Sequence, residues 1–307
     1  MSDQVNNQQI VQEPRQYRVK LMCCWTSSKQ LCDIWNRQSQ GNYKWNNITV
    51  TYKDEKIDYY VIINSANGEY YDPAKTIIFH MEPAFVRAGW EPKWKNPDEK
   101  QFLQVRSHDK FMNNAEWHLG KTYTELMNEK ITKTKIFSTV TSSSYMSDYH
   151  KKRVNFIKFL EMKGVDIDIF GRSNNVGYHN YKGACPWIDK TNGLYPYKYT
   201  FAAENSKEHN YVTEKLFDAI LSECLCFYDG CPNVTDYINR DAIIQIDLNN
   251  YEKSYEIITA AIANDEWSKR IEIIREEKMK ILNELQFFPM LEKIINEHQA
   301  KLKSATA

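Results

Sequence analysis

The residues best suited to chemistry lie in two short stretches, Tyr199–Ser206 (Tyr-Thr-Phe-Ala-Ala-Glu-Asn-Ser) and Tyr211–Leu216 (Tyr-Val-Thr-Glu-Lys-Leu). The first stretch is predicted to end a β-strand, and a helix is predicted to begin near Val212 after a polar loop. Loops at the carboxyl ends of parallel strands bind ligands, and the free N–H groups of a helix start bind anions. Lys215 adds a positive charge there, and Glu214 can accept hydrogen bonds from a sugar. The pattern indicates a site for an anionic ligand, although both residues also suit an ordinary exposed helix start.

A second candidate is Glu82, which follows the predicted strand Thr76–His80 and precedes Pro83. Side chains just past a strand end project into a cleft, where a carboxylate can take a proton from a hydroxyl group as a general base. The alternative is a turn acid with a structural role. His80 is predicted to be a core histidine rather than a second base.

The stretch from about Tyr195 to Tyr237 resembles the donor-binding motif of the α-1,3/4-fucosyltransferase family, glycosyltransferase family 10. The matching segments are Tyr197-Lys-Tyr199, Phe201-Ala-Ala-Glu204-Asn205-Ser206, Tyr211-Val-Thr-Glu-Lys215 and Gly230-Cys-Pro232-Asn233-Val234. The segment Ile136–Gly171 fits the family more loosely, and the N-terminal half matches it weakly. The resemblance therefore rests mainly on the second half of the chain.

The resemblance implies two Rossmann-like α/β domains of the GT-B type, with GDP-fucose bound to the C-terminal one. It implies inverting transfer of L-fucose to a glycan hydroxyl, α-1,3 on N-acetylglucosamine, with Glu82 as the general base. The donor-binding residues that it implies are Arg153, Tyr199, Asn205, Tyr211, Glu214 and Lys215. Arg153 stands where the family has an arginine that grips the diphosphate, although Ser142-Ser143-Ser144 replaces the family's preceding Ser-Asn. Fixed positive groups of this kind lower the barrier to departure of a diphosphate.

Two other functions remain open at this point. The chain can be a glycan- or nucleotide-sugar-binding protein that has lost catalysis, or a transferase that uses another nucleotide sugar. The joint presence of Glu82, Arg153, Glu214 and Lys215 favours the fucosyltransferase.

Strands alternate with helices along the chain, which predicts an α/β protein with parallel sheets. The pattern becomes more regular after about residue 134, so a domain boundary is expected near residues 128–135. The predicted divisions are a disordered leader (1–15), an acceptor-binding domain (16–130), a GDP-fucose-binding domain (131–290) and a C-terminal tail (291–307).

Composition excludes several classes of protein. The 307 residues include 40 basic and 40 acidic side chains, so the formal net charge is zero and gives the protein no general attraction to nucleic acid. No apolar run approaches the roughly 20 residues that span a membrane, and the N-terminus lacks the apolar core of a signal peptide. The seven cysteines show no paired pattern that would indicate disulfides. A soluble cytoplasmic protein is therefore expected. Asp166-Ile-Asp168 matches a metal-binding D-x-D pattern, but its alternation with apolar residues is typical of a strand. The expected partners are GDP-fucose and a glycan, and the motif requires no metal, although a divalent ion is compatible with it.

Overall fold

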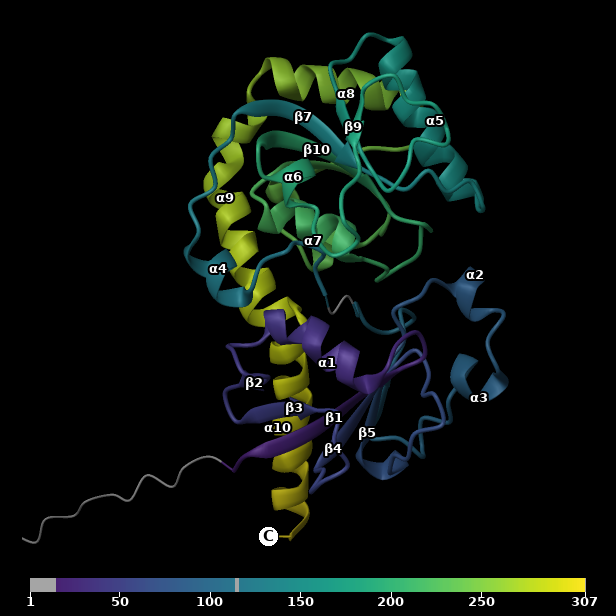
Figure 1. Cartoon of the computed structure of the whole chain (residues 1–307), viewed down its shortest axis with the longest axis vertical. Coiled ribbons are helices and arrows are strands. Elements are labelled where there is room, and N and C mark those ends of the chain that lie inside the picture. Colours follow the sequence, from purple (N-terminus) through teal and green to yellow (C-terminus); the bar gives the residue numbers. More distant parts are fainter. Residues whose placement is uncertain (1–14, 114–115, 307) are drawn as a thin grey trace, which may run out of the picture.

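The computed structural model describes residues 15–113 and 116–306, which form two lobes (Figure 1). Each lobe is built around a largely parallel sheet, so the α/β class is as predicted. In Figure 1 the N-terminal lobe is purple to blue apart from the yellow α10, and the C-terminal lobe runs from teal through green to the yellow-green of α8 and α9. The predicted leader, residues 1–15, lies outside the described residues except for Arg15. Within the described ranges, no helix has the length and apolar character needed to cross a membrane.

The N-terminal sheet has the order β2-β3-β1-β4-β5-β6, and only the β2–β3 pair is antiparallel. Its strands are β1 (Tyr17–Cys23), β2 (Lys44–Trp45), β3 (Ile48–Thr51), β4 (Tyr59–Ile63), β5 (Thr76–Phe79) and β6 (Gln104–Arg106). The helices of this half are α1 (Ser28–Trp35), α2 (Ala84–Arg87), α3 (Pro92–Lys95) and α4 (Tyr123–Asn128). With β2 set aside, this is the 2-1-3-4-5 order of doubly wound sheets, whose strand order reverses between β1 and β4.

Local sequence explains two interior strands of this sheet, β4 and β5. Every residue of β4 and β5 is buried, and both segments are continuous runs rich in Ile, Val and aromatic residues. Parallel strands that are buried on both faces have this composition, whereas half-exposed strands alternate. Helix α1 begins after Ser27, whose hydroxyl oxygen accepts a hydrogen bond from the backbone N–H of Gln30.

The C-terminal sheet is entirely parallel and has the order β12-β11-β10-β7-β8-β9. Its strands are β7 (Lys135–Val140), β8 (Asp168–Phe170), β9 (Tyr181–Gly183), β10 (Tyr197–Ala203), β11 (Leu225–Asp229) and β12 (Ile243–Gln245). The helices that follow are α5 (Asp148–Met162), α6 (Thr191–Leu194), α7 (Glu214–Leu221), α8 (Tyr251–Ala263), α9 (Glu266–Lys280) and α10 (Phe287–Thr306). This is the Rossmann order 3-2-1-4-5-6, with its switch point between β7 and β10, where such sheets bind ligands.

The end of the chain differs from the prediction. A π-helical segment, η5 (Ile281–Leu285), joins α9 to α10, and α10 runs along the N-terminal lobe (yellow, Figure 1). The side chains of Phe287, Leu291 and Ile295 recur at helical spacing and are buried in the N-terminal core, where Phe287 packs on Trp35. Residues 291–306 are therefore a core helix of the first lobe and not a tail, because their apolar stripe needs a partner surface.

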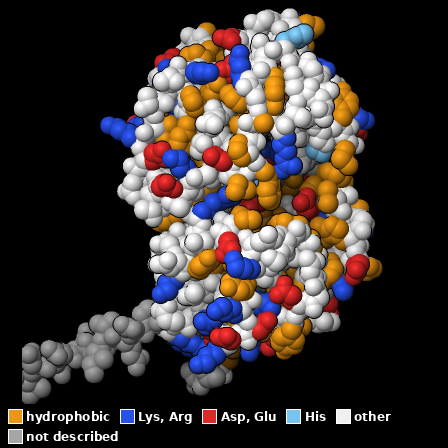
Figure 2. Space-filling view, viewed as in Figure 1, with side chains coloured by type: hydrophobic (Ala, Val, Ile, Leu, Met, Phe, Trp, Pro, Cys, Tyr) orange, Lys and Arg blue, Asp and Glu red, His pale blue; other side chains and the backbone are white. Residues whose placement is uncertain are grey.

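The carboxyl ends of the two sheets face one another. Trp25 follows β1, Asn64 follows β4 and Glu82 follows β5, and all three line a cavity together with Asn205, which follows β10. Figure 2 shows hydrophobic and charged side chains mixed at the level where the lobes meet. Both doubly wound sheets thus present their ligand-binding edges to the same space.

Candidate active site

Two adjoining cavities occupy the space between the sheet edges. The first cavity, of about 310 Å³, lies at the switch point and is lined by the residues that end β7 and β10 and by the start of α7. Its charged lining residues are the cations Arg153, Arg172, Lys190 and Lys215 and the carboxylates Glu214 and Asp218. The excess of cations suits an anionic ligand.

Arg153 comes from the second turn of α5 and crosses the switch point. Its guanidinium donates hydrogen bonds to the backbone oxygen of Ala203 at 3.2 Å, to the side-chain oxygen of Asn205 at 3.1 Å and to the hydroxyl of Ser142 at 3.0 Å. The side chain is buried, and burial lowers the pKa of the guanidinium from its usual value. Among the described residues no carboxylate forms an ion pair with it. A buried cation that is oriented but unpaired is a ready anion-binding group.

Gly171 allows the edge of the first cavity to close. A Cβ atom at this position would overlap the backbone oxygen of Thr141, which follows β7. Only glycine permits the chain after β8 to approach the chain after β7 so closely. Glycine is therefore required at position 171 because a side chain has no room there, and not because of an unusual backbone angle.

Glu204 holds the start of α7 in place. Its buried carboxylate accepts hydrogen bonds from the backbone N–H of Thr213 at 2.9 Å and from the Thr213 hydroxyl at 2.6 Å. Thr213 is the N-cap of α7, so Glu204 fixes the point at which the helix begins. A Cβ atom at Gly230 would lie 2.5 Å from the Glu204 side chain, which explains the glycine in the following turn.

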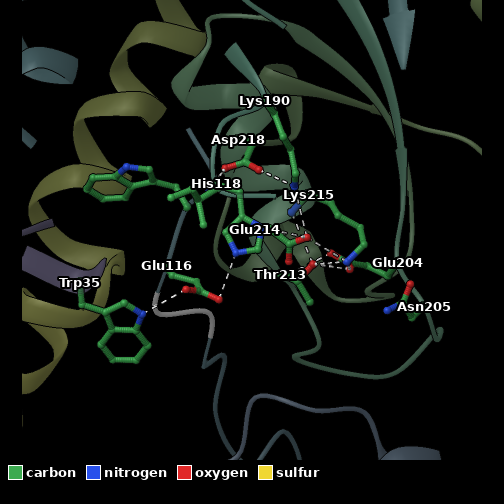
Figure 3. A network of polar contacts seen from close by, with 12 residues as sticks. Trp35, Glu116, His118, Lys190, Glu204, Asn205, Thr213, Glu214, Lys215 and Asp218 are labelled. Carbon is green, nitrogen blue, oxygen red and sulfur yellow. Dashed lines mark hydrogen bonds and ion pairs between the residues drawn. The ribbon is translucent and has the colours of Figure 1, made fainter. Parts of the chain in front are cut away.

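Glu214 and Lys215, both predicted site residues, lie in the first turn of α7 and face both cavities (Figure 3). Oε1 of Glu214 is 3.3 Å from the ammonium nitrogens of Lys215 and Lys190. Burial opposes ionisation of Glu214, but these two cations overcome it and hold its pKa well below the usual range. Lys215 also lies 3.5 Å from Glu204, and Lys190 lies 2.7 Å from Asp218. The carboxylate of Glu214 therefore stays charged and its position is fixed.

Three groups near Glu214 were not predicted. Its carboxylate lies 4.0 Å from Nδ1 of His118, and Nε2 of His118 lies 3.2 Å from Glu116. Glu116 in turn accepts a hydrogen bond of 3.1 Å from the indole N–H of Trp35, in the N-terminal lobe (Figure 3). These three residues, Glu116, His118 and Lys190, lie on irregular segments, where no hydrophobic periodicity could have predicted their positions. The contacts link the two lobes through the site.

The second cavity, of about 280 Å³, lies on the side of the N-terminal lobe and contains Glu82. Burial raises the pKa of Glu82, Lys215 opposes this rise, and Glu214 and Glu116 add to it. A base with a raised pKa accepts a proton more readily near neutral pH. The structure thus brings Glu82 close to the predicted residues of the other lobe.

Two predicted tyrosines lie at different places. Tyr199 is in the middle of β10, buried, and its hydroxyl donates to the backbone oxygen of Ala261 and accepts from the backbone N–H of Trp267. It lines neither cavity, so its predicted contact with the donor is wrong and its role is in the core. Tyr211 lines the second cavity, where its ring packs edge-on against His108.

Two groups that the sequence analysis discounted, His80 and Asp168, make contacts within the fold. His80 is buried, packs against Trp90, and burial lowers its pKa to about 4. Asp168 pairs with Lys135 at 3.0 Å and with Lys182 at 3.3 Å. The described part of the chain contains no group of three or more His, Cys, Asp or Glu side chains arranged for a metal ion.

A family model described as "Glycosyltransferase family 10 (fucosyltransferase) C-term" matches residues 130–266, which contain the switch point, Arg153 and the start of α7. Residues 130–266 are therefore similar to the C-terminal domain of glycosyltransferase family 10. An α-(1,3)-fucosyltransferase of Helicobacter pylori is 31% identical to the chain over 86 residues. That alignment spans 28% of this chain and only 16% of the relative.

Solved structures resemble most of the chain in fold. An α1,3-fucosyltransferase crystallised with GDP gives a TM-score of 0.53 at 16% identity, covering 86% of this chain and 83% of that one. A glycosyltransferase from Rickettsia africae gives a TM-score of 0.51 at 11% identity, and the alignment covers 94% of this chain and 99% of that one. The architecture is GT-B, as the resemblance implied.

Proposed function

We propose that this chain is an inverting fucosyltransferase that moves L-fucose from GDP-fucose to a glycan hydroxyl. One observation carries the proposal. Arg153 is a buried cation without an ion pair in the described ranges, and it lies at the switch point of a family 10 domain. A bound diphosphate would supply the missing negative charge. The similarity to α-1,3-fucosyltransferases, one of them crystallised with GDP, supports fucose as the transferred sugar and GDP as the nucleotide.

The first cavity would hold the donor. Arg153 and Lys215 would bind the diphosphate, with Lys215 exchanging its contacts with Glu204 and Glu214 for phosphate oxygens. Fixed positive charge stabilises the leaving group as the bond to the sugar breaks. The Glu214 carboxylate, which lines both cavities, would then face the sugar ring as positive charge develops on it.

Glu82 would act from the second cavity as the general base. The acceptor oxygen forms a bond to C1 of fucose, the C1–O bond to the diphosphate breaks, and GDP leaves with the electron pair. The hydroxyl proton passes to Glu82. Attack from the face opposite the leaving group inverts the configuration, so a β-linked donor gives an α-fucoside. From the resemblance, the linkage would be α-1,3 to N-acetylglucosamine.

The test is incubation with GDP-fucose and a panel of glycans, with GDP release measured and the product linkage determined by NMR. Acceptor-dependent release with an α-fucosyl product supports the proposal. Donor binding without turnover on a broad panel would instead indicate a binding protein, and thermal stabilisation by UDP or CMP in place of GDP would indicate another donor. We also propose that arginine and lysine replace a metal ion, so EDTA should leave the rate unchanged.

A further inference from the structure

Two tryptophans with large exposed surfaces stand in the second cavity. Trp25, between β1 and α1, is 45% exposed and lines this cavity but not the first one. Trp187, in the loop after β9, is 47% exposed and lines both cavities. The ring of an exposed tryptophan that lines a cavity offers a large apolar face for a ligand. Trp25 therefore marks a binding surface on the N-terminal side that the first cavity does not share.

Asn64 adds a polar group to the same surface. Its side chain is almost fully buried, it lines the second cavity, and its backbone has φ 64°, in the left-handed region. Its side-chain oxygen accepts a hydrogen bond of 2.8 Å from the backbone N–H of Met81, next to Glu82. Its amide nitrogen donates to no group in residues 15–113 or 116–306. A buried side chain with an unused donor that faces a cavity is typical of a ligand site.

The charge of the second cavity differs from that of the first. It is lined by three carboxylates, Glu82, Glu116 and Glu214, and by one lysine, Lys215, with His118 beside them. Another carboxylate entering this space would face like charges at short range. The cavity is therefore unsuited to an acidic ligand, whereas the first cavity suits one.

We propose that the second cavity is a subsite for a neutral pyranose ring of the acceptor, and that Trp25 and Asn64 determine its specificity. The apolar face of the ring packs on Trp25, and the Asn64 amide donates to a ring substituent beside the hydroxyl that faces Glu82. The carboxylates disfavour uronic acids and other acidic sugars. This inference rests on the proposed function, and it names the class of acceptor.

Two variants separate this subsite from the donor site. Trp25→Ala removes the ring, and Asn64→Asp removes the amide donor while keeping the side-chain oxygen and a residue type that tolerates the left-handed conformation. Tyr70→Ala is the control, because Tyr70 is 72% exposed and lines neither cavity. With N-acetyllactosamine as acceptor, we expect each variant to raise the acceptor KM about tenfold or more, with kcat and GDP affinity close to those of the parent.

Binding is measured separately by saturation-transfer NMR of N-acetyllactosamine with the GDP-loaded protein. A signal lost in Trp25→Ala and kept in Tyr70→Ala supports the subsite even if no transfer occurs, in which case only the proposed function fails. Unchanged acceptor KM and an unchanged signal in both Trp25→Ala and Asn64→Asp would overturn the inference while leaving transfer intact. Equal binding of a matched disaccharide whose acceptor ring carries a C6 carboxylate would overturn the selectivity for neutral sugars.

Discussion

Arg153 donates a hydrogen bond of 3.1 Å to Asn205 across the point where the strand order of the C-terminal sheet reverses. The two residues are 52 positions apart and come from α5 and from the loop after β10. The bond orients the guanidinium, while its Nε finds no partner in the described part of the chain. Folding therefore prepares a directed positive charge before any ligand binds.

Replacing Arg153 by Met should remove GDP binding without unfolding the protein. Loss of a buried cation that has no ion pair costs little folding free energy, and methionine adapts to the space. GDP at one hundred times its Kd should stabilise the parent by about 2.7 kcal/mol in thermal unfolding, and the variant far less. Lys152→Met is the control, since Lys152 lies on the same helix and outside both cavities. Equal stabilisation of both variants would place the diphosphate elsewhere.

Glu82 and Lys215 should fail in different ways when replaced. Glu82→Gln keeps the size and hydrogen-bonding capacity of the side chain but cannot take a proton. Turnover should fall by roughly 10²–10⁴-fold with GDP-fucose affinity nearly intact. Lys215→Ala should weaken GDP binding and also slow transfer, because the leaving group loses a charge partner. If Glu82→Gln kept turnover within a fewfold of the parent, another group would be the base.

Local pattern predicted the loop and helix start at α7 and the strand end before Glu82, whereas the roles of the residues there came from the family resemblance. A strand, a polar loop and a capped helix are encoded within about 20 residues, and the structure begins the helix at Glu214, two residues beyond the predicted Val212. The predicted contact of Tyr199 with the donor was wrong because a motif does not show toward which face of the sheet a side chain points. Successive side chains of a strand point to opposite faces. Tyr199 also lies four residues before the end of β10, away from the ligand-binding edge.

The remaining errors concern contacts between distant segments. His118 and Lys190 approach Glu214, and Glu116 approaches His118, only because the segment 116–118 and the loop before α6 come to the edge of the first cavity. The return of α10 to the first lobe is equally non-local, because its apolar stripe does not say which sheet it covers. Local sequence patterns thus predict helices and strands well, but they predict the contacts between distant elements poorly.

The packing of α10 leads to a stability prediction. Leu291 is fully buried in the N-terminal core, so Leu291→Ala should lower the free energy of unfolding by about 2–5 kcal/mol. Urea denaturation followed by tryptophan fluorescence would measure it, because Trp35 and Trp45 lie in the same core. Lys301→Ala, at an exposed position of the same helix, should change little. If Leu291→Ala lowered the free energy of unfolding by less than about 1 kcal/mol, α10 would not be part of the N-terminal core.

The acid limb of the pH–rate profile should report Glu82. Burial raises the pKa of Glu82 above its ordinary value, so activity should be lost as the pH falls through that raised pKa. The negative charge of Glu116 contributes to the rise, and Glu116→Gln should therefore move the limb to lower pH. Glu91→Gln, outside both cavities, should leave the limb in place. A limb that stays fixed in Glu116→Gln would have to be assigned to a different group.

His80 should make stability depend on pH. Its pKa is lowered by burial from 6.5 to about 4 in the folded protein, while an unfolded chain keeps the ordinary value. The folded state then binds fewer protons, so the stability that His80 contributes is complete above pH 6.5 and is lost as the pH falls toward 4. Between pH 7 and pH 5 the loss from this residue should be about 2 kcal/mol. His80→Gln cannot be protonated, so urea denaturation at the two pH values should show a smaller difference for the variant than for the parent by that amount. Equal pH dependence in the two proteins would mean that His80 is protonated, or hydrated, in the folded state.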